Sequence, residues 1–192
     1  MLEFEELDGT ADADGLSAAD LSSANCFQTY IRQMNEGSLS WQRTHAGSTI
    51  RCWWWVIAEE FIGRISLRPD LTPDVPHANH IGYAVRPSRR RQGHATAMLA
   101  TALPTAFELG IDPVILVCAE TNVTSRKVIQ RNGGRLDAIL DGHCHYSIEQ
   151  HSAFKVLSGT RPLPARQSLI QSVRRHPWWK VPIPCTGGSE QP

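Results

Sequence analysis

Residues 81–96 read IGYAVRPSRRRQGHAT, and this stretch decides how the chain is expected to fold. Residues 80–85 favour a β-strand, and Pro87 ends that strand because proline lacks the N–H group that a β-ladder needs. Beyond Gly93, apolar residues recur every three to four positions as far as Gly110, which predicts a helix with a glycine just past its end. We therefore expect a strand that leads through an arginine-rich turn into a helix.

The turn between this strand and this helix has the chemistry of an anion site. The small residues Gly93 and Ala95 let backbone N–H groups at a helix N-terminus approach a phosphate, and the helix dipole favours negative charge there. Arginines 89–91 supply charge-assisted contacts. The alternative is that the arginines form only a solvated turn and that Gly93 only starts the helix. Neither a Gly-Lys-Ser/Thr P-loop nor a three-glycine dinucleotide fingerprint occurs in the sequence.

Hydrophobic patterning predicts further elements on both sides of this segment. Pro104 should bend or split the helix that contains it, and the continuous apolar run 113–118 is typical of a strand buried on both faces. The tryptophans at 53–55 cannot share one face of a strand, so Trp54 should lie opposite the other two. The expected elements are one or two helices within 17–36, a hairpin of strands 49–58 and 61–67, strand 113–118, helix 124–132, strand 135–140, one or two strands within 143–157, and helix only at 167–175 beyond residue 158.

Length and composition fit one soluble domain of 192 residues, with 19 basic against 19 acidic side chains and 41% hydrophobic content. This charge balance argues against nucleic-acid and membrane partners, because both normally require a positive excess. The five irregularly spaced cysteines are expected to be reduced, and His143, Cys144 and His145 lack the paired spacing of a structural zinc site, so no metal is expected. The sequence has neither a signal-peptide pattern nor a membrane-length apolar run, which favours a cytoplasmic location. We expect a domain over residues 1–157 and a proline-rich extension over 158–192 that packs on it or forms a homodimer contact.

Two linked motifs resemble the GNAT acetyltransferases. Residues 90–95 match the family's acetyl-CoA signature, which is Gln or Arg, two residues, Gly, one residue, then Gly or Ala. The second motif is Asn122-Val123-Thr124-Ser125 followed by Gly133-Gly134, and the shared order of elements covers about residues 49–146. The resemblance implies an α/β fold with a mixed, mostly antiparallel twisted sheet, splayed at the cofactor cleft and with helices on both faces.

The resemblance also implies a cofactor site, in which the amides of residues 91–96 hold the pyrophosphate of acetyl-CoA. Val85 would offer backbone groups to the pantetheine where its strand splays from the strand near Val117, and a backbone N–H near Val85 would polarise the thioester carbonyl. Asn122 and Ser125 would lie beside the pantetheine and the thioester. The expected cofactor-binding residues are Val85, Arg90, Arg91, Gln92, Gly93, His94, Ala95, Thr96, Asn122 and Ser125.

The proton donor and acceptor are less well defined. Ile129 stands where many family members have a tyrosine that protonates the leaving thiolate. Ser125 or Tyr146 would then act as the acid in its place. Alternatively no acid is used, because a thiol with a pKa of about 8.5 leaves readily. An amine must be neutral to attack, so a base is needed, and His80 and Glu120 are the candidates by location. Direct transfer is favoured over an acyl-enzyme at Cys118.

The expected reaction is acetyl transfer to a primary amine of a small molecule, and an overall likeness within the family suggests an aminoglycoside of the kasugamycin type. The alternatives are a peptide or protein amine, a polyamine, and a non-catalytic acetyl-CoA-binding module. Residues 174–180 mix basic and aromatic side chains; they could grip nucleic acid, but packing on the fold or a dimer contact is favoured. The expected acceptor-site residues are Trp41, Trp54, Asp70 and Asp74.

Overall fold

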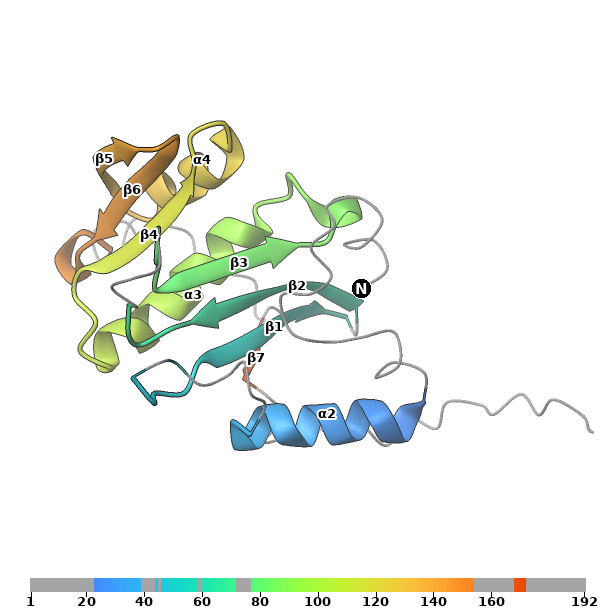
Figure 1. Ribbon diagram of the computed structural model, residues 1–192. Helices are drawn as coiled ribbons and strands as arrows, with labels where there is room; N and C mark the ends of the chain where they lie inside the picture. Colours follow the sequence, from blue (N-terminus) through green and yellow to red (C-terminus); the bar gives the residue numbers. More distant parts are fainter. Residues whose placement is uncertain are drawn as a thin grey trace, which may run out of the picture.

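The computed structural model describes residues 23–38, 44, 46–58, 60–71, 77–153 and 168–171. Trp41, Asp74 and residues 174–180 lie outside these ranges, as do the first residues of the predicted helical segment 17–36. The described strands form two antiparallel sheets, with strand orders β3-β2-β1-β7 and β4-β6-β5 (Figure 1). The predicted mixed α/β fold is confirmed.

The larger sheet contains the predicted hairpin, and the three tryptophans alternate across it. Strands β1 (Arg51–Ile57) and β2 (Glu60–Leu67) pair antiparallel, with a register shift between Trp55 and Val56. Trp53 and Trp55 belong to the main hydrophobic core, whereas Trp54 packs against a second cluster on the other face of β1. β2 also pairs with β3 (Ile81–Val85), and β7 (Ser168–Gln171) adds to the outer edge of β1.

The C-terminal helix that we expected at 167–175 is wrong for residues 168–171. These residues are the strand β7, whose partners in β1 run from Trp53 to Val56. A strand forms because β1 otherwise presents unpaired backbone groups at that edge, and tertiary pairing overrides weak local helix preference.

Helices cover both faces of the larger sheet. Helix α2 (Ala24–Glu36) begins after Ser23, whose hydroxyl accepts a hydrogen bond from the N–H of Cys26, and ends at Gly37, whose φ is 65°. Its buried side chains Tyr30 and Met34 pack with Ile50 and Cys52 on the Trp54 side of β1.

Helix α3 (His94–Glu108) covers the opposite face and buries Met98, Leu99, Ala102, Leu103 and Ala106 in the main core. It continues through Pro104 without splitting, because apolar residues on both sides of the proline are held in the core. Leu109 caps it, and Gly110, with a φ of 79°, follows in the predicted position.

The smaller sheet contains β4 (Val114–Ala119), β5 (Arg135–Leu140) and β6 (His143–Ile148), and helix α4 (Val123–Arg131) connects β4 to β5. The expectation that β4 is buried on both faces is wrong. Val114 and Leu116 are buried in the main core, but Ile115 and Val117 are only partly buried. The half-exposed face continues onto β6, where His145 is the register partner of Val117.

The two sheets meet at His80 and diverge from there. The N–H of His80 donates to the carbonyl of Ile115 at 2.9 Å, and the carbonyl of His80 accepts from the N–H of Arg68 at 2.7 Å. The N–H of Ile115 donates in turn to Nδ1 of the His80 ring at 2.9 Å. Strands β3 and β4 start beside this joint and separate toward their C-terminal ends (Figure 1). The splay predicted near Val85 and Val117 therefore opens from His80.

Candidate functional site

A cavity of about 1140 Å³ lies beside the open edge of β3, between β2, the turn that leads into α3, and α4. Seven of the described residues that line it are basic and none is acidic. Such a lining favours a ligand with several negative charges. The lining residues are Arg64, Ile65, Ser66, Arg68, Gly82, Tyr83, Ala84, Val85, Arg89, Arg90, Arg91, Gly93, His94, Ala95, Thr96, Asn122, Thr124, Ser125, Lys127, Val128 and Arg131.

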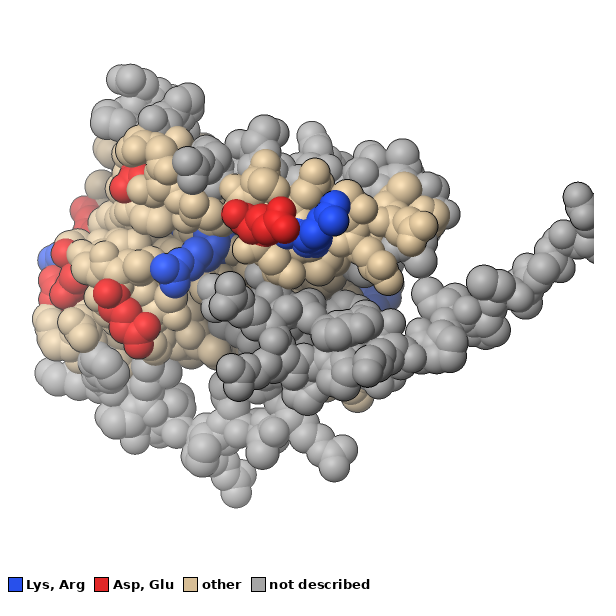
Figure 2. Space-filling model, turned by 90° about the horizontal axis from the view of Figure 1, so that it is seen from below, with Lys and Arg blue, Asp and Glu red and all other residues tan. Residues whose placement is uncertain are grey.

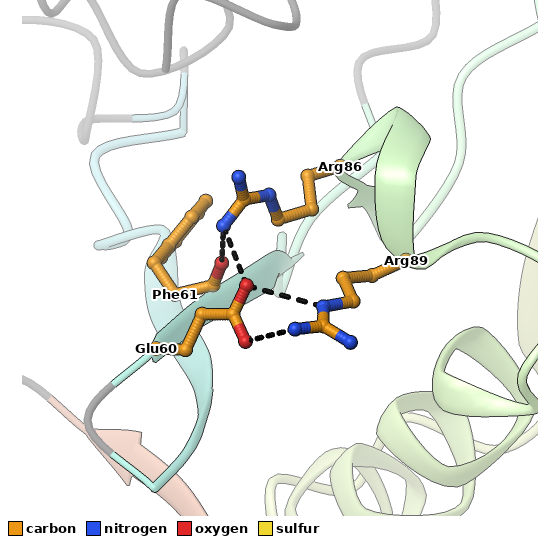
Figure 3. A network of polar contacts seen from close by, with 4 residues as sticks. All are labelled: Glu60, Phe61, Arg86 and Arg89. Carbon is orange, nitrogen blue, oxygen red and sulfur yellow. Dashed lines mark hydrogen bonds and ion pairs between the residues drawn. The ribbon is translucent and has the colours of Figure 1, made fainter.

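The arginine-rich turn is fixed in place by Glu60 at the start of β2 (Figure 3). One carboxylate oxygen of Glu60 accepts from Nη1 of Arg86 at 2.9 Å and from Nε of Arg89 at 3.1 Å, and the other accepts from Nη2 of Arg89 at 2.6 Å. Arg86 also donates to the carbonyl of Phe61 at 3.2 Å. Two of the turn's arginines are thus ion-paired within the protein. These ion pairs hold the short helix η3 (Pro87–Arg89) against β2.

The rest of the turn presents backbone groups to the cavity. Nε of Arg90 donates to the carbonyl of Val85 at 3.0 Å, which folds the turn back over the end of β3. Arg91 and Gly93 have φ values of 64° and 85°, and this left-handed geometry directs the chain into α3. A Cβ atom built at Gly93 meets nothing within 4 Å, so open space lies above the helix N-terminus. Residues 91–96 thus have the geometry of an anion-binding site, and we call this segment the cradle.

His94, the first residue of α3, lines the cradle as a neutral ring. Its pKa is lowered from the ordinary value, first by burial and then by the positive charge of Arg89. At neutral pH it therefore offers a hydrogen-bonding imidazole and adds no charge to the lining.

Helix α4 forms the other wall, and Ser125 links it to β3. The side chain of Asn122 accepts a hydrogen bond from the N–H of Ser125 at 3.0 Å and so caps α4. The hydroxyl oxygens of Ser125 and Tyr83 are 2.7 Å apart, which joins α4 to β3 across the diverging strands. Burial raises the pKa of Tyr83 to about 12, although the Ser125 hydrogen bond opposes the shift.

The exposed edge of β3 presents the backbone of alternate residues. The N–H of Arg86 donates to the carbonyl of Ile62, and backbone groups alternate in direction along an antiparallel strand. The backbone groups of Tyr83 and Val85 therefore point away from β2 and toward the gap between β3 and β4.

The residues predicted to bind the cofactor are brought together. Nine of them line one cavity: Val85, Arg90, Arg91, Gly93, His94, Ala95, Thr96, Asn122 and Ser125. The tenth, Gln92, is exposed in the turn and is not in the lining. Their role in binding stays a prediction.

The other predicted catalytic residues are not in the lining. The Nδ1 atom of His80 accepts a hydrogen bond at the joint, and burial lowers the pKa of its ring. Glu120 is exposed beyond the end of β4, where its N–H donates to the carbonyl of Gly142 at 2.7 Å. Tyr146 is buried in the core, with Nε of Arg126 at 3.4 Å from its hydroxyl, and Ile129 is buried in the core as well.

The two predicted acceptor-site residues that the structure describes are also engaged elsewhere. Trp54 packs edge-on against Phe61, with ring centroids 5.7 Å apart. A carboxylate oxygen of Asp70 accepts from the hydroxyl of Thr44 at 3.0 Å, and hydrogen bonds from Ser48 and then Thr44 hold the pKa of Asp70 below its ordinary value. Neither residue is in the lining of the cavity.

Several lining residues were not predicted. Tyr83 lies within residues 81–96, but its contact with Ser125 spans 42 residues of sequence and no local pattern indicates it. The charged and polar residues that were missed also include five at alternate positions from 64 to 68 or on α4, where such side chains ordinarily face solvent. They are Arg64, Ser66, Arg68, Lys127 and Arg131.

Comparison with protein families decides the identity of the fold. Residues 4–135 match the family model described as an acetyltransferase (GNAT) domain. The chain belongs to the GNAT acetyltransferases. Family membership confirms the resemblance read from the two motifs, and with it the expectation of an acetyl-CoA-dependent N-acetyltransferase. No curated protein is significantly similar to the chain in sequence.

Solved GNAT structures resemble the chain at low identity. Mycobacterium smegmatis RimJ in complex with CoA-disulfide is 21% identical with a TM-score of 0.49, over 80% of this chain and 75% of that one. Campylobacter jejuni N-acetyltransferase PseH in complex with acetyl coenzyme A is 14% identical with a TM-score of 0.46, over 71% of this chain and 94% of that one. The GNAT domain of S. lividans PAT is 20% identical with a TM-score of 0.45, over 52% of this chain and 60% of that one.

The described part of the chain contains no group of three or more His, Cys, Asp or Glu side chains arranged to hold a metal ion. Within the same ranges, no helix combines the length and apolar character needed to cross a membrane.

Proposed function

We propose that this GNAT acetyltransferase binds acetyl-CoA in the cavity and transfers its acetyl group directly to a primary amine of a small molecule. The observation that carries the proposal is the cavity itself, in which a helix N-terminus with open space above it adjoins a basic lining and the open edge of β3. Coenzyme A has the matching form, because its phosphates lie at one end and its thiol at the end of a long neutral arm.

The phosphates fit the N-terminus of α3. The backbone N–H groups of residues 93–96 and the side chains of Arg90 and Arg91 supply hydrogen bonds and charge there, and Lys127 and Arg131 approach from α4. The pantetheine arm would then follow the edge of β3, where the backbone of Val85 and Tyr83 can pair with its amides. This course leads the thioester toward Ser125.

The hydroxyl pair of Tyr83 and Ser125 is suited to receive the leaving thiolate. Tyr83, with a pKa of about 12, stays protonated at neutral pH. A thiol with an ordinary pKa of about 8.5 is the stronger acid, so the pair stabilises the thiolate by hydrogen bonding and does not fully protonate it. The Tyr83–Ser125 pair would thus contact the leaving thiolate, which the apolar side chain of Ile129, buried in the core, cannot do.

Direct transfer agrees with the state of Cys118. Burial raises the pKa of its thiol above the ordinary value, which makes it a poor nucleophile at neutral pH. The amine would attack the thioester carbonyl while a backbone N–H of β3 polarises the carbonyl oxygen. Its proton would leave to water or to Glu120, since the Nδ1 atom of His80 already accepts a hydrogen bond.

The acceptor class is a separate matter. An aminoglycoside of the kasugamycin type is the candidate that the sequence resemblance suggests, and a peptide amine or a polyamine are the alternatives. A polycationic acceptor is normally met by carboxylates, and the described lining of the cavity contains none. A small amine with fewer positive charges is the acceptor that this lining favours.

A thiol-release assay over an amine library tests the proposal. We expect acetyl-CoA to release CoA in the presence of at least one small primary amine, and the acetylated amine to appear in equal amount by mass spectrometry. Stoichiometric binding of acetyl-CoA with no turnover over the whole library would favour the non-catalytic module instead.

A further inference from the structure

We propose that the acceptor amine carries an anionic group, a phosphate or a carboxylate, and that Arg68 binds it. This inference rests on the proposed function, because it concerns the second substrate of the same cavity. It identifies Arg68 as a specificity-determining residue.

The face of the sheet on which Arg68 lies follows from the alternation of β2. Ile65 and Leu67 are fully buried in the main core under α3. Ser66 and Arg68 therefore belong to the opposite face, and both line the cavity. The cavity thus extends from the cradle to the side of the sheet away from α3.

The guanidinium of Arg68 is held over β3. Its Nη1 atom lies 3.5 Å from the hydroxyl of Ser66, which in turn lies 3.5 Å from the carbonyl of Gly82. A Cβ built at Gly82 would be 3.4 Å from that Nη1 atom and 3.4 Å from the Ser66 hydroxyl. The guanidinium therefore lies directly beside Gly82 at the cavity wall, at the distance of a van der Waals contact.

Arg68 is too far along the strand to serve the cradle. Its backbone is bonded to His80 at the closed end of the diverging strands, whereas the cradle begins after Val85 at the open end. The guanidinium itself lies beside Gly82, and the three residues of extended strand from there to Val85 span about 10 Å. The phosphates at the helix N-terminus and a group bound at Arg68 are thus two separate anions.

The charge of the lining indicates what that second anion belongs to. With acetyl-CoA in the cradle, the end of the cavity near Gly82 is where the acceptor must approach the thioester. Arg68 contributes a positive charge there, and no described lining residue contributes a negative one. A guanidinium binds phosphate and carboxylate oxygens in a planar, paired geometry. An acceptor with both an amine and an anionic group can place the amine at the thioester while its anionic group binds the guanidinium of Arg68.

The test compares matched ligands by calorimetry on the protein loaded with CoA. One pair is glucosamine 6-phosphate and glucosamine, and the other is L-phenylalanine and phenethylamine; spermidine represents amines that carry only positive charge. We expect the member of at least one pair that carries the phosphate or carboxylate to bind ten-fold or more tightly than its partner without that group, and more tightly than spermidine. The pair that shows this preference distinguishes phosphate from carboxylate.

Variants assign the preference to Arg68. Arg68→Gln should abolish it and leave the affinity for CoA unchanged, Arg68→Lys should retain part of it, and the control Arg135→Gln, at an exposed ion pair on β5, should keep all of it. Equal affinities within both pairs, tighter binding of spermidine, or a preference that survives in Arg68→Gln would overturn the inference. If the preference holds but no amine releases thiol from acetyl-CoA, the proposed function fails and the anion site stands.

Discussion

Gly93 and Gly110 share a backbone conformation, but only Gly93 lies in the cradle. Substitutions at the two positions therefore separate an effect on cofactor binding from an effect on stability. Their φ values are 85° and 79°, and a Cβ at either position meets nothing within 4 Å. A side chain at either should cost about 1–2 kcal/mol of stability through left-handed strain. Only Gly93 lines the cavity.

We therefore expect Gly93→Val to weaken acetyl-CoA binding at least ten-fold, because its side chain would fill the open space in which we propose that the phosphates bind. Gly110→Val, at the far end of α3, should lose similar stability and keep its affinity. Calorimetric titration and thermal unfolding of the two variants provide the comparison. Unchanged affinity in Gly93→Val would mean that the phosphates lie elsewhere.

Tyr83 and Tyr146 form a second matched pair. The hydroxyl of Tyr83 meets Ser125 in the cavity, whereas that of Tyr146 is buried in the core beside Arg126. A hydrogen bond to a charged group contributes about 1.5–3 kcal/mol, which corresponds to a roughly 10- to 100-fold loss of kcat for Tyr83→Phe. The KM for acetyl-CoA should change little, and Tyr146→Phe should keep kcat. Equal kcat values in both variants would remove Tyr83 from the mechanism.

At the scale of elements, the strands β3 and β4 are joined through a neutral histidine. Burial lowers the pKa of His80 below its ordinary value, and the negative charge of Asp70 only partly opposes this. The unfolded chain therefore takes up a proton at a pH where the folded chain does not. Stability should fall as the pH drops below about 6.5, by at most about 1.4 kcal/mol per pH unit for this group.

The variant His80→Asn separates this contribution from that of the other titrating groups. An asparagine carbonyl can accept the hydrogen bond from the N–H of Ile115, but it does not titrate. Denaturant unfolding at pH 7.5 and pH 5.5 should show a smaller loss of stability in the variant than in the native protein. Identical losses would mean that His80 is not held neutral by the joint.

The elements themselves were largely predictable because their signals are local. Proline at 87, glycine at 93 and the apolar spacing beyond it set the strand, turn and helix of the cradle. The contacts that complete the site were not predictable from such signals. Glu60 meets Arg86 across 26 residues, and Tyr83 meets Ser125 across 42. The half-exposed face of β4 likewise depends on where the sheets diverge, which its apolar sequence does not reveal.

At the scale of the whole molecule, zero net charge conceals a strong separation of charge. The 19 basic and 19 acidic side chains cancel, yet the described lining of the cavity has seven basic residues and no acidic one. On the face shown in Figure 2, by contrast, described acidic and basic side chains lie near one another. The protein can therefore attract an anionic cofactor locally without the overall positive charge of a nucleic-acid-binding protein.

Hydrogen–deuterium exchange with and without acetyl-CoA shows directly which residues of the chain the cofactor contacts, because bound backbone amides exchange more slowly. We predict slower exchange at residues 83–85, at residues 91–96 and at the start of α4, with no change in β5. Protection confined to other segments, or no protection at saturating acetyl-CoA, would contradict the assignment of the cavity as the cofactor site.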